Sequence, residues 1–158
     1  MKTLLLVIFT FAVTLDAQAQ LRSPDSLFIF GTSIHFKDGG NGENMKHKGG
    51  DTNEFNYGLG VQWRLEDADS LSIGAYRNSY YKDSQFVLYG FNLWDTKRGI
   101  YTYRLEFLAG GITGYGDHPK DISFYAAPMF TVKRNRLGLS TIWVPGTVVA
   151  FGLTYDLN

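Results

Sequence analysis

The chain has 158 residues with 15 basic and 15 acidic side chains, so its formal net charge at pH 7 is zero. This length allows one domain with its own core and leaves no room for a second module. A balanced charge disfavours nucleic acid as a partner, because phosphate binding requires a basic excess. The chain has no cysteine, which excludes a disulfide framework and thiolate chemistry. Abundant glycine and tyrosine with sparse proline are typical of a β protein.

The first residues have the pattern of a secretory signal peptide, which we assign to residues 1–19. A lysine follows the first residue, an apolar run covers residues 4–13, and Ala17-Gln18-Ala19 supplies a small-residue cleavage site. The apolar run is too short for a retained transmembrane helix. We therefore expect an exported protein with a single domain over residues 20–158.

Eight segments after this leader are candidate β-strands, and no segment has a convincing helical period. The expected strands are residues 27–36, 54–65, 70–80, 85–94, 100–112, 122–132, 136–144 and 147–157. Short charged connections (66–69, 95–99 and 133–136) alternate with two long glycine-rich ones (37–53 and 113–121). Short turns at one end and long loops at the other predict an all-β fold, an eight-stranded antiparallel up-and-down transmembrane β-barrel of the bacterial outer membrane.

The alternation of side chains along these strands supports a barrel that faces lipid. Bulky apolar side chains share one parity with each other, and small or polar side chains share the opposite parity. The bulky set is Phe55, Tyr57, Leu59, Val61, Trp63 and Leu65 in the second strand, Tyr101, Tyr103, Leu105 and Phe107 in the fifth, and Phe151, Leu153, Tyr155 and Leu157 in the eighth. An eight-stranded barrel has a narrow interior, so we expect this set to face outward. A soluble lipocalin-like barrel is the alternative, although its outer face would then carry few charges.

The hairpin at residues 70–94 carries polar groups where a small β protein would place a site. Asn78 and Ser79 lie at the end of its first strand, and His35 lies at the end of the first strand of the barrel. Only one strand separates these two strands, so the three side chains could meet across the mouth, with His35 polarising a hydroxyl. The alternatives are a solvated histidine at the rim and turn chemistry for the Asn-Ser pair.

Other titratable residues have simpler interpretations. Arg64, Arg104 and Glu106 are expected to face inward and to pair with one another in the lumen. His47 and His118 stand in loops without ligand-like spacing to other histidines or carboxylates. We therefore predict no metal site and no cofactor.

Four features in order make the chain similar to the PagP family of outer-membrane lipid A palmitoyltransferases. They are His35 before a long first loop, the Asn78-Ser79 pair in the third strand, Tyr89-Gly90-Phe91 in the fourth, and Ile142-Trp143-Val144-Pro145-Gly146-Thr147 between the last two. The resemblance covers nearly all of the expected mature chain. The last feature is the most specific of the four.

The resemblance implies transfer of an acyl chain from a phospholipid donor to a hydroxyl of lipid A. It assigns the catalytic positions to His35, Asn78 and Ser79; the family has Asp where this chain has Asn78, which forms hydrogen bonds but carries no charge. Gly90 corresponds to the floor of the acyl pocket, beside apolar residues of the fourth strand such as Leu88.

The resemblance also assigns a lateral opening for lipid to Pro128 and Pro145. Independently, a proline cannot donate a hydrogen bond to a β-ladder, so two prolines on adjacent strands predict a weak seam. We expect a membrane-embedded monomer that acts as an acyltransferase with no nucleic-acid partner. The alternatives are a non-enzymatic barrel of the same fold that binds lipid or is structural, and a soluble periplasmic carrier of an apolar ligand.

Overall fold

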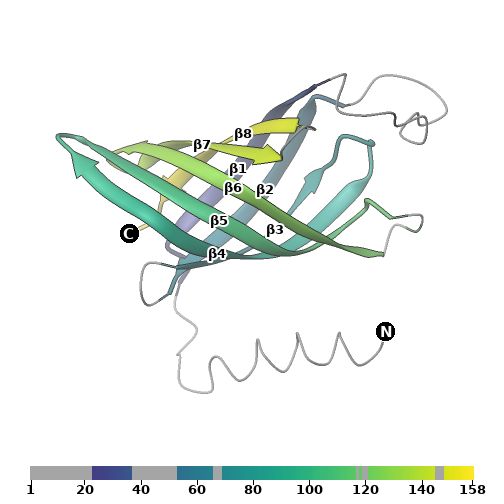
Figure 1. Cartoon of the computed structure of the whole chain (residues 1–158), viewed down its shortest axis with the longest axis horizontal. Helices are drawn as coiled ribbons and strands as arrows, with labels where there is room; N and C mark the ends of the chain where they lie inside the picture. The colour runs from purple at the N-terminus through teal and green to yellow at the C-terminus, as the bar shows by residue number, and fades with distance from the viewer. Residues whose placement is uncertain (1–22, 37–52, 66–68, 117, 119–120, 145–147) are drawn as a thin grey trace, which may run out of the picture.

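The computed structural model describes residues 23–36, 53–65, 69–116, 118, 121–144 and 148–158. The predicted signal peptide and Pro145 lie outside these residues. Eight strands wind round one axis (Figure 1). They are β1 (Ser26–His35), β2 (Phe55–Arg64), β3 (Ser70–Arg77), β4 (Asp83–Arg98), β5 (Tyr101–Thr113), β6 (Ile122–Arg134), β7 (Leu137–Val144) and β8 (Val148–Asp156).

The strands form one closed antiparallel barrel. Each strand pairs with the next along the chain, and β1 pairs with β8 from Ser26↔Asp156 to His35↔Val148. This closure confirms the predicted fold class. We call the end with the β2–β3, β4–β5 and β6–β7 connections the turn end, and the opposite end the loop end. Within the described residues, no helix is long and apolar enough to cross a membrane.

The strand limits differ from the predicted ones mainly in β3 and β4. β3 ends at Arg77 rather than residue 80, because the Asn78 side chain accepts hydrogen bonds from the Tyr80 and Lys82 backbone N–H groups and forms a turn. β4 continues to Arg98, so the predicted connection at 95–99 is wrong. A bulge near Leu93 shifts the register, and the strand then pairs with β5 as far as Arg98↔Tyr101.

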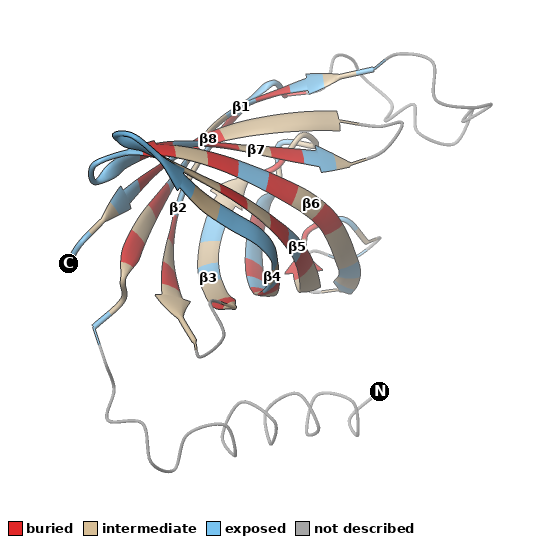
Figure 2. Cartoon of the chain, turned by 60° about the vertical axis from the view of Figure 1, so that its left-hand side comes forward, coloured by how far each residue is buried: buried red, intermediate tan, exposed pale blue. Residues whose placement is uncertain are grey.

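The bulky apolar parity faces outward, as predicted (Figure 2). In β2, Phe55, Tyr57 and Leu59 are between 56% and 65% exposed, whereas Asn56 and Gln62 are each 6% exposed. Large apolar side chains are also exposed on the other seven strands. They include Ile29, Ile73, Val87, Phe91, Trp94, Phe107, Phe124, Phe130, Leu139, Trp143, Leu153 and Tyr155. The outer wall is therefore an almost continuous apolar surface.

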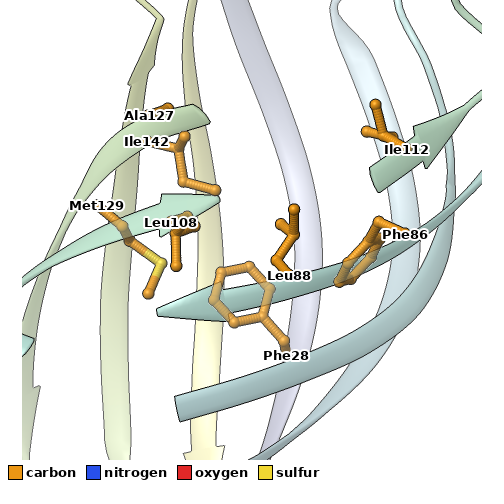
Figure 3. Close-up of a cluster of buried hydrophobic side chains, with 8 residues drawn as sticks. All are labelled: Phe28, Phe86, Leu88, Leu108, Ile112, Ala127, Met129 and Ile142. Atoms are coloured by element: carbon orange, nitrogen blue, oxygen red, sulfur yellow. The ribbon is translucent and has the colours of Figure 1, made fainter. Parts of the chain in front are cut away.

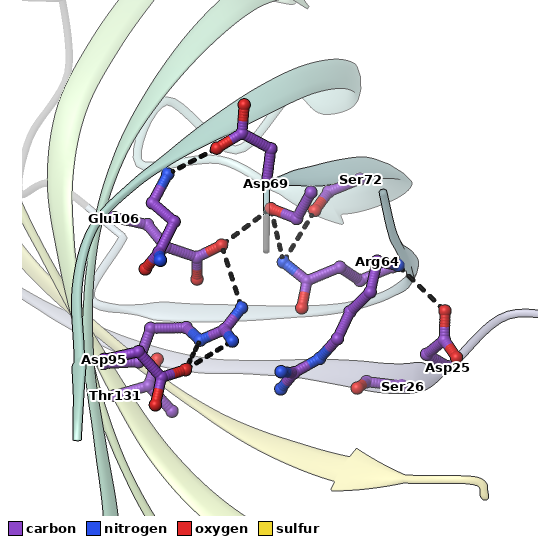
Figure 4. A network of polar contacts seen from close by, with 12 residues as sticks. Asp25, Ser26, Arg64, Asp69, Ser72, Asp95, Glu106 and Thr131 are labelled. Atoms are coloured by element: carbon purple, nitrogen blue, oxygen red, sulfur yellow. Dashed lines mark hydrogen bonds and ion pairs between the residues drawn. The ribbon is translucent and has the colours of Figure 1, made fainter. Parts of the chain in front are cut away.

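The lumen toward the turn end is polar (Figure 4). Glu106, 1% exposed, accepts a hydrogen bond from the Ser70 hydroxyl at 2.7 Å and lies 3.8 Å from the Arg104 guanidinium. Arg104 also donates to the Asp95 carboxylate. Lys133 donates to Asp156 at 2.8 Å and 3.0 Å. The predicted inward pairing of Arg104 with Glu106 is thus confirmed, and opposite charges fill this part of the barrel.

The lumen toward the loop end is apolar (Figure 3). The buried cluster consists of Phe28, Phe86, Leu88, Leu108, Ile112, Ala127, Met129 and Ile142. Glycines on the facing strands make room for the rings, since a Cβ at Gly74 would lie 2.6 Å from the ring of Phe86, and one at Gly152 would lie 2.9 Å from the ring of Phe28. The interior therefore has two layers, one ionic and one apolar.

Replacing Glu106 tests the ionic layer. Glu106→Ala removes the acceptor of Ser70 and one partner of Arg104, and we expect the free energy of unfolding to fall by about 3 kcal/mol. Glu106→Gln keeps an acceptor for Ser70 and should cost about half as much. Urea unfolding of the detergent-refolded barrel, followed by tryptophan fluorescence, measures both variants. An unchanged midpoint for Glu106→Ala would contradict a structural role for this layer.

Candidate functional site

A β-bulge in β1 turns His35 toward the lumen. The register with both β2 and β8 shifts between Phe30 and Thr32. Opposite β8, where Phe30 pairs with Gly152 and Thr32 with Phe151, Gly31 is the extra residue. Before the bulge the even residues Phe28 and Phe30 face inward, and after it the odd residues Ser33 and His35 do. If β1 alternated regularly through Gly31, without a bulge, His35 would share the outward face of Ile29. The bulge at Gly31 therefore decides which side of the wall the imidazole occupies.

Ser79 is placed by the turn that follows β3. Its backbone carbonyl accepts a hydrogen bond from the Asn53 N–H at 2.9 Å, which ties the turn to the start of β2. The Asn53 side chain also donates to the Asn78 carbonyl at 3.1 Å. Two backbone positions of the turn are therefore held by one asparagine on the neighbouring strand.

His35 and Ser79 are in direct contact. The Nε2 atom of His35 lies 2.8 Å from the Ser79 Oγ, which is a hydrogen-bond distance between a basic nitrogen and a hydroxyl. The structure brings these two sequence-predicted residues together from strand ends that are 44 positions apart. We call this pair the His–Ser dyad.

The outer nitrogen of the imidazole has a different environment. The His35 Nδ1 atom is buried and has no hydrogen-bond partner among the described residues. Glu54, at the beginning of β2, interacts electrostatically with the ring. A neutral imidazole that accepts the Ser79 proton at Nε2 would carry its own proton on Nδ1. Within the part of the chain that the structure describes, the dyad therefore has no hydrogen-bonded acid behind it.

Asn78 lies next to the dyad, but its side chain forms hydrogen bonds that stabilise the fold. It is fully buried, and its Oδ1 accepts the N–H groups of Tyr80 and Lys82. Its Nδ2 donates to the Ser84 hydroxyl at 2.9 Å and to the Gly114 carbonyl at 3.0 Å. The oxygen of the amide therefore has partners within the turn, and the nitrogen has partners in β4 and in the connection after β5. A carboxylate could not make the contact with Gly114, because both oxygens would be acceptors.

An apolar cavity of about 100 Å³ reaches from the buried cluster to Ser79. Leu88 lines this cavity. The rings of Phe30, Tyr76 and Phe86 restrict its size, since the ring centroids of Phe30 lie 5.0 Å from Tyr76 and 5.3 Å from Phe86. An engineered protein cavity of about 150 Å³ holds one benzene molecule. A long acyl chain therefore requires these rings to move.

Gly90 lies at the boundary between the two layers of the lumen. A Cβ there would lie 2.3 Å from the Ser70 Oγ, 3.1 Å from a Glu106 oxygen and 3.2 Å from the Leu108 side chain. The residue is therefore packed against the ionic layer, below the apolar cluster.

Pro128 lies where the ladder between β6 and β7 stops. The pairing runs from Arg134↔Leu137 to Met129↔Ile142, and Pro128 is the next residue of β6. From Ile122 to Pro128, β6 pairs with β5 alone among the described strands. The predicted break in the ladder is therefore present at this proline, while Pro145 lies outside the described residues.

Sequence reasoning missed a pair of tyrosines at the mouth of the cavity. The hydroxyls of Tyr76 and Tyr115 lie 2.8 Å apart, and both side chains line the cavity together with Ser79. Burial raises the pKa of the Tyr115 hydroxyl, so the phenol stays protonated and can donate a hydrogen bond at neutral pH. Tyr115 lies in the connection between β5 and β6, which Asn78 holds through Gly114. No local motif marks this contact between distant segments.

The described residues contain no group of three or more histidine, aspartate or glutamate side chains that could hold a metal ion.

No protein-family model matches this chain, and no curated protein does. One solved structure that it resembles is the outer membrane protein Ail of Yersinia pestis in a phospholipid bilayer nanodisc, at 12% identity over 85% of this chain and 100% of that one. The TM-score is 0.42, and we base no argument on this likeness.

The substitution Asn78→Asp tests whether position 78 serves as a catalytic acid or as an amide that stabilises the turn. Two N–H donors are lost and a carboxylate faces the Gly114 carbonyl, so we expect a loss of about 1–3 kcal/mol in the free energy of unfolding. Urea unfolding measures this, with Asn135→Asp in the exposed β6–β7 turn as a control that adds the same charge. A variant as stable as the parent would show that the turn does not need the amide.

Proposed function

We propose that this chain is an outer-membrane β-barrel that transfers an acyl chain from a phospholipid to a hydroxyl of lipid A. The observation that carries the proposal is the 2.8 Å contact between His35 Nε2 and Ser79 Oγ at the mouth of an apolar cavity. A base, a hydroxyl and an apolar tunnel that meet at one point fit acyl transfer from a lipid.

The membrane placement is supported by the outer wall. Apolar side chains are exposed on all eight strands, whereas charged side chains gather in the lumen or at the two ends. A water-soluble protein rarely exposes apolar surface on this scale. Closure of the barrel gives each strand a neighbour on both sides, which a lipid environment favours. The turn end would face the periplasm and the dyad would lie at the outer surface.

In this proposal His35 acts as the general base. It accepts a proton at Nε2, either from Ser79 or from the lipid A hydroxyl that Ser79 positions. The deprotonated oxygen attacks the ester carbonyl of the phospholipid, the acyl–oxygen bond breaks, and His35 returns the proton to the released lysophospholipid oxygen. Where Ser79 is the nucleophile, the lipid A hydroxyl then gives its proton to His35 and attacks the acyl-Ser79 ester, and the released Ser79 oxygen takes that proton back. The tyrosine pair at the cavity mouth offers a phenol O–H toward the carbonyl oxygen. The break in the ladder at Pro128 is the side through which a chain would enter.

A second candidate is a lipid-binding barrel without turnover. Two observations favour this candidate. No described residue forms a hydrogen bond with His35 Nδ1, so no acid among them supports an imidazolium, and the Asn78 side chain is engaged in holding the turn. The small cavity favours a short or partly inserted chain in either case. The two candidates differ in turnover alone.

The deciding measurement is transfer from labelled phosphatidylcholine to lipid A by the detergent-refolded protein. We expect His35→Ala and Ser79→Ala each to lower the rate at least about 100-fold, because the general base or its hydroxyl is lost. Matched controls are His118→Ala in an exposed loop and Ser72→Ala, which lines the same cavity without contacting the dyad. Heat-modifiable migration in gels verifies that each variant is folded. No transfer by a folded parent, with lipid still bound, would select the second candidate.

A further inference from the structure

Two neighbouring turns at the turn end of the barrel carry four exposed cations. Lys97 and Arg98 end β4, while Arg134 ends β6 and Arg136 lies in the turn that follows it. We call these four side chains the cationic rim. They contribute to neither the dyad nor the ionic layer of the lumen.

The β-ladders place two of these cations in one row on the outer face. Arg98 pairs with Tyr101 on β5, and Tyr101 pairs with Arg134 on β6. Paired residues point to the same side of a sheet, and the exposed Tyr101 belongs to the outward parity of β5. Because adjacent strands lie about 4.8 Å apart, the two arginines stand roughly 10 Å from each other with a tyrosine between them.

The cationic rim has no counter-charge among the described residues. Among the residues that the structure describes, its four side chains take part in no hydrogen bond or ion pair. The nearest acids in the ladder are used inside the barrel, since Asp95 binds Arg104 and Asp156 binds Lys133. The positive charge of the rim is therefore available to an external anion.

An apolar band begins directly above the rim. The outward residues of the next two rows are apolar except for two threonines, and none is acidic. These residues are Thr96, Tyr103, Val132 and Leu139 in one row and Trp94, Leu105, Phe130 and Thr141 in the other. Arginine and tyrosine at the edge of an apolar band match the zone where the hydrocarbon core of a bilayer meets its headgroups.

We propose that the cationic rim binds the phosphates of anionic phospholipids in the inner leaflet of the outer membrane. The inference rests on the membrane placement in the proposed function and is independent of acyl transfer. Each exposed cation near an anionic leaflet increases the affinity for that leaflet by a factor on the order of five. Because the rim spans β4 to β7 alone, the attraction acts on one side of the barrel, below the strand that carries Pro128.

Tryptophan quenching can locate this lipid preference. The chain has three tryptophans, and Trp63→Phe/Trp143→Phe leaves Trp94, which is 45% exposed on the outer face above the rim. The protein is reconstituted in vesicles of equal phosphatidylcholine and phosphatidylglycerol, with bromine on the acyl chains of either lipid in turn. We expect brominated phosphatidylglycerol to quench Trp94 more strongly than brominated phosphatidylcholine does. The difference should correspond to a several-fold enrichment of phosphatidylglycerol next to Trp94. The enrichment should disappear in Arg98→Gln/Arg134→Gln and in 1 M salt, where the screening length is about 3 Å.

Two controls make the result specific. A protein that keeps only Trp143, 51% exposed near the loop end of β7, should be quenched equally by both lipids. Arg77→Gln removes a cation at the loop end that pairs with Asp83, and it should leave the enrichment at Trp94 unchanged. Equal quenching of Trp94 by both lipids, or the same loss with Arg77→Gln, would overturn the rim as a phosphate site. No quenching by either lipid would overturn the membrane placement as well.

Discussion

Pairing of β1 with β8 is the constraint on which the rest of the structure depends. Once these strands pair, every strand has a neighbour on each side, and the barrel has a fixed, narrow lumen. Backbone groups of the wall then pair between strands, except in stretches such as residues 122–128, which pair with β5 alone among the described strands. The outer face is therefore free to be apolar. The lumen must also be filled. Ionic side chains fill it near the turn end, and apolar side chains fill it toward the loop end.

The ionic layer and the apolar layer have opposite consequences. Near the turn end, Glu106, Arg104 and Asp95 hold neighbouring strands together through buried charges that must stay paired. Near the loop end, the rings of Phe28 and Phe86 fill the lumen against glycines and leave a cavity. The dyad lies at the mouth of this cavity, on the side of the barrel opposite the ionic layer.

The site also shows how small backbone features decide chemistry. A bulge at Gly31 places His35 on the inner face, where regular alternation along β1 would have placed it on the outer one. One buried amide, Asn78, fixes the turn that presents Ser79 and ties it to the loop that carries Tyr115. Both the oxygen and the nitrogen of this amide have hydrogen-bond partners, so the side chain supports the turn.

The sequence by itself determined the strand number and the outward parity, because alternation with period two and the order of antiparallel strands follow from local chemistry. It placed His35 and Ser79 at the same end of the barrel, but only the bulge at Gly31 turned the imidazole inward to meet Ser79. It also marked Pro128 as a break in the ladder, since proline lacks the N–H donor. Only the tertiary structure decided the extension of β4, the role of Asn78 and the tyrosine pair of the cavity. Each of these depends on contacts between segments far apart in the chain, such as Asn78 with Gly114 and Asp95 with Arg104. No local pattern encodes such contacts, because closure of the barrel selects them.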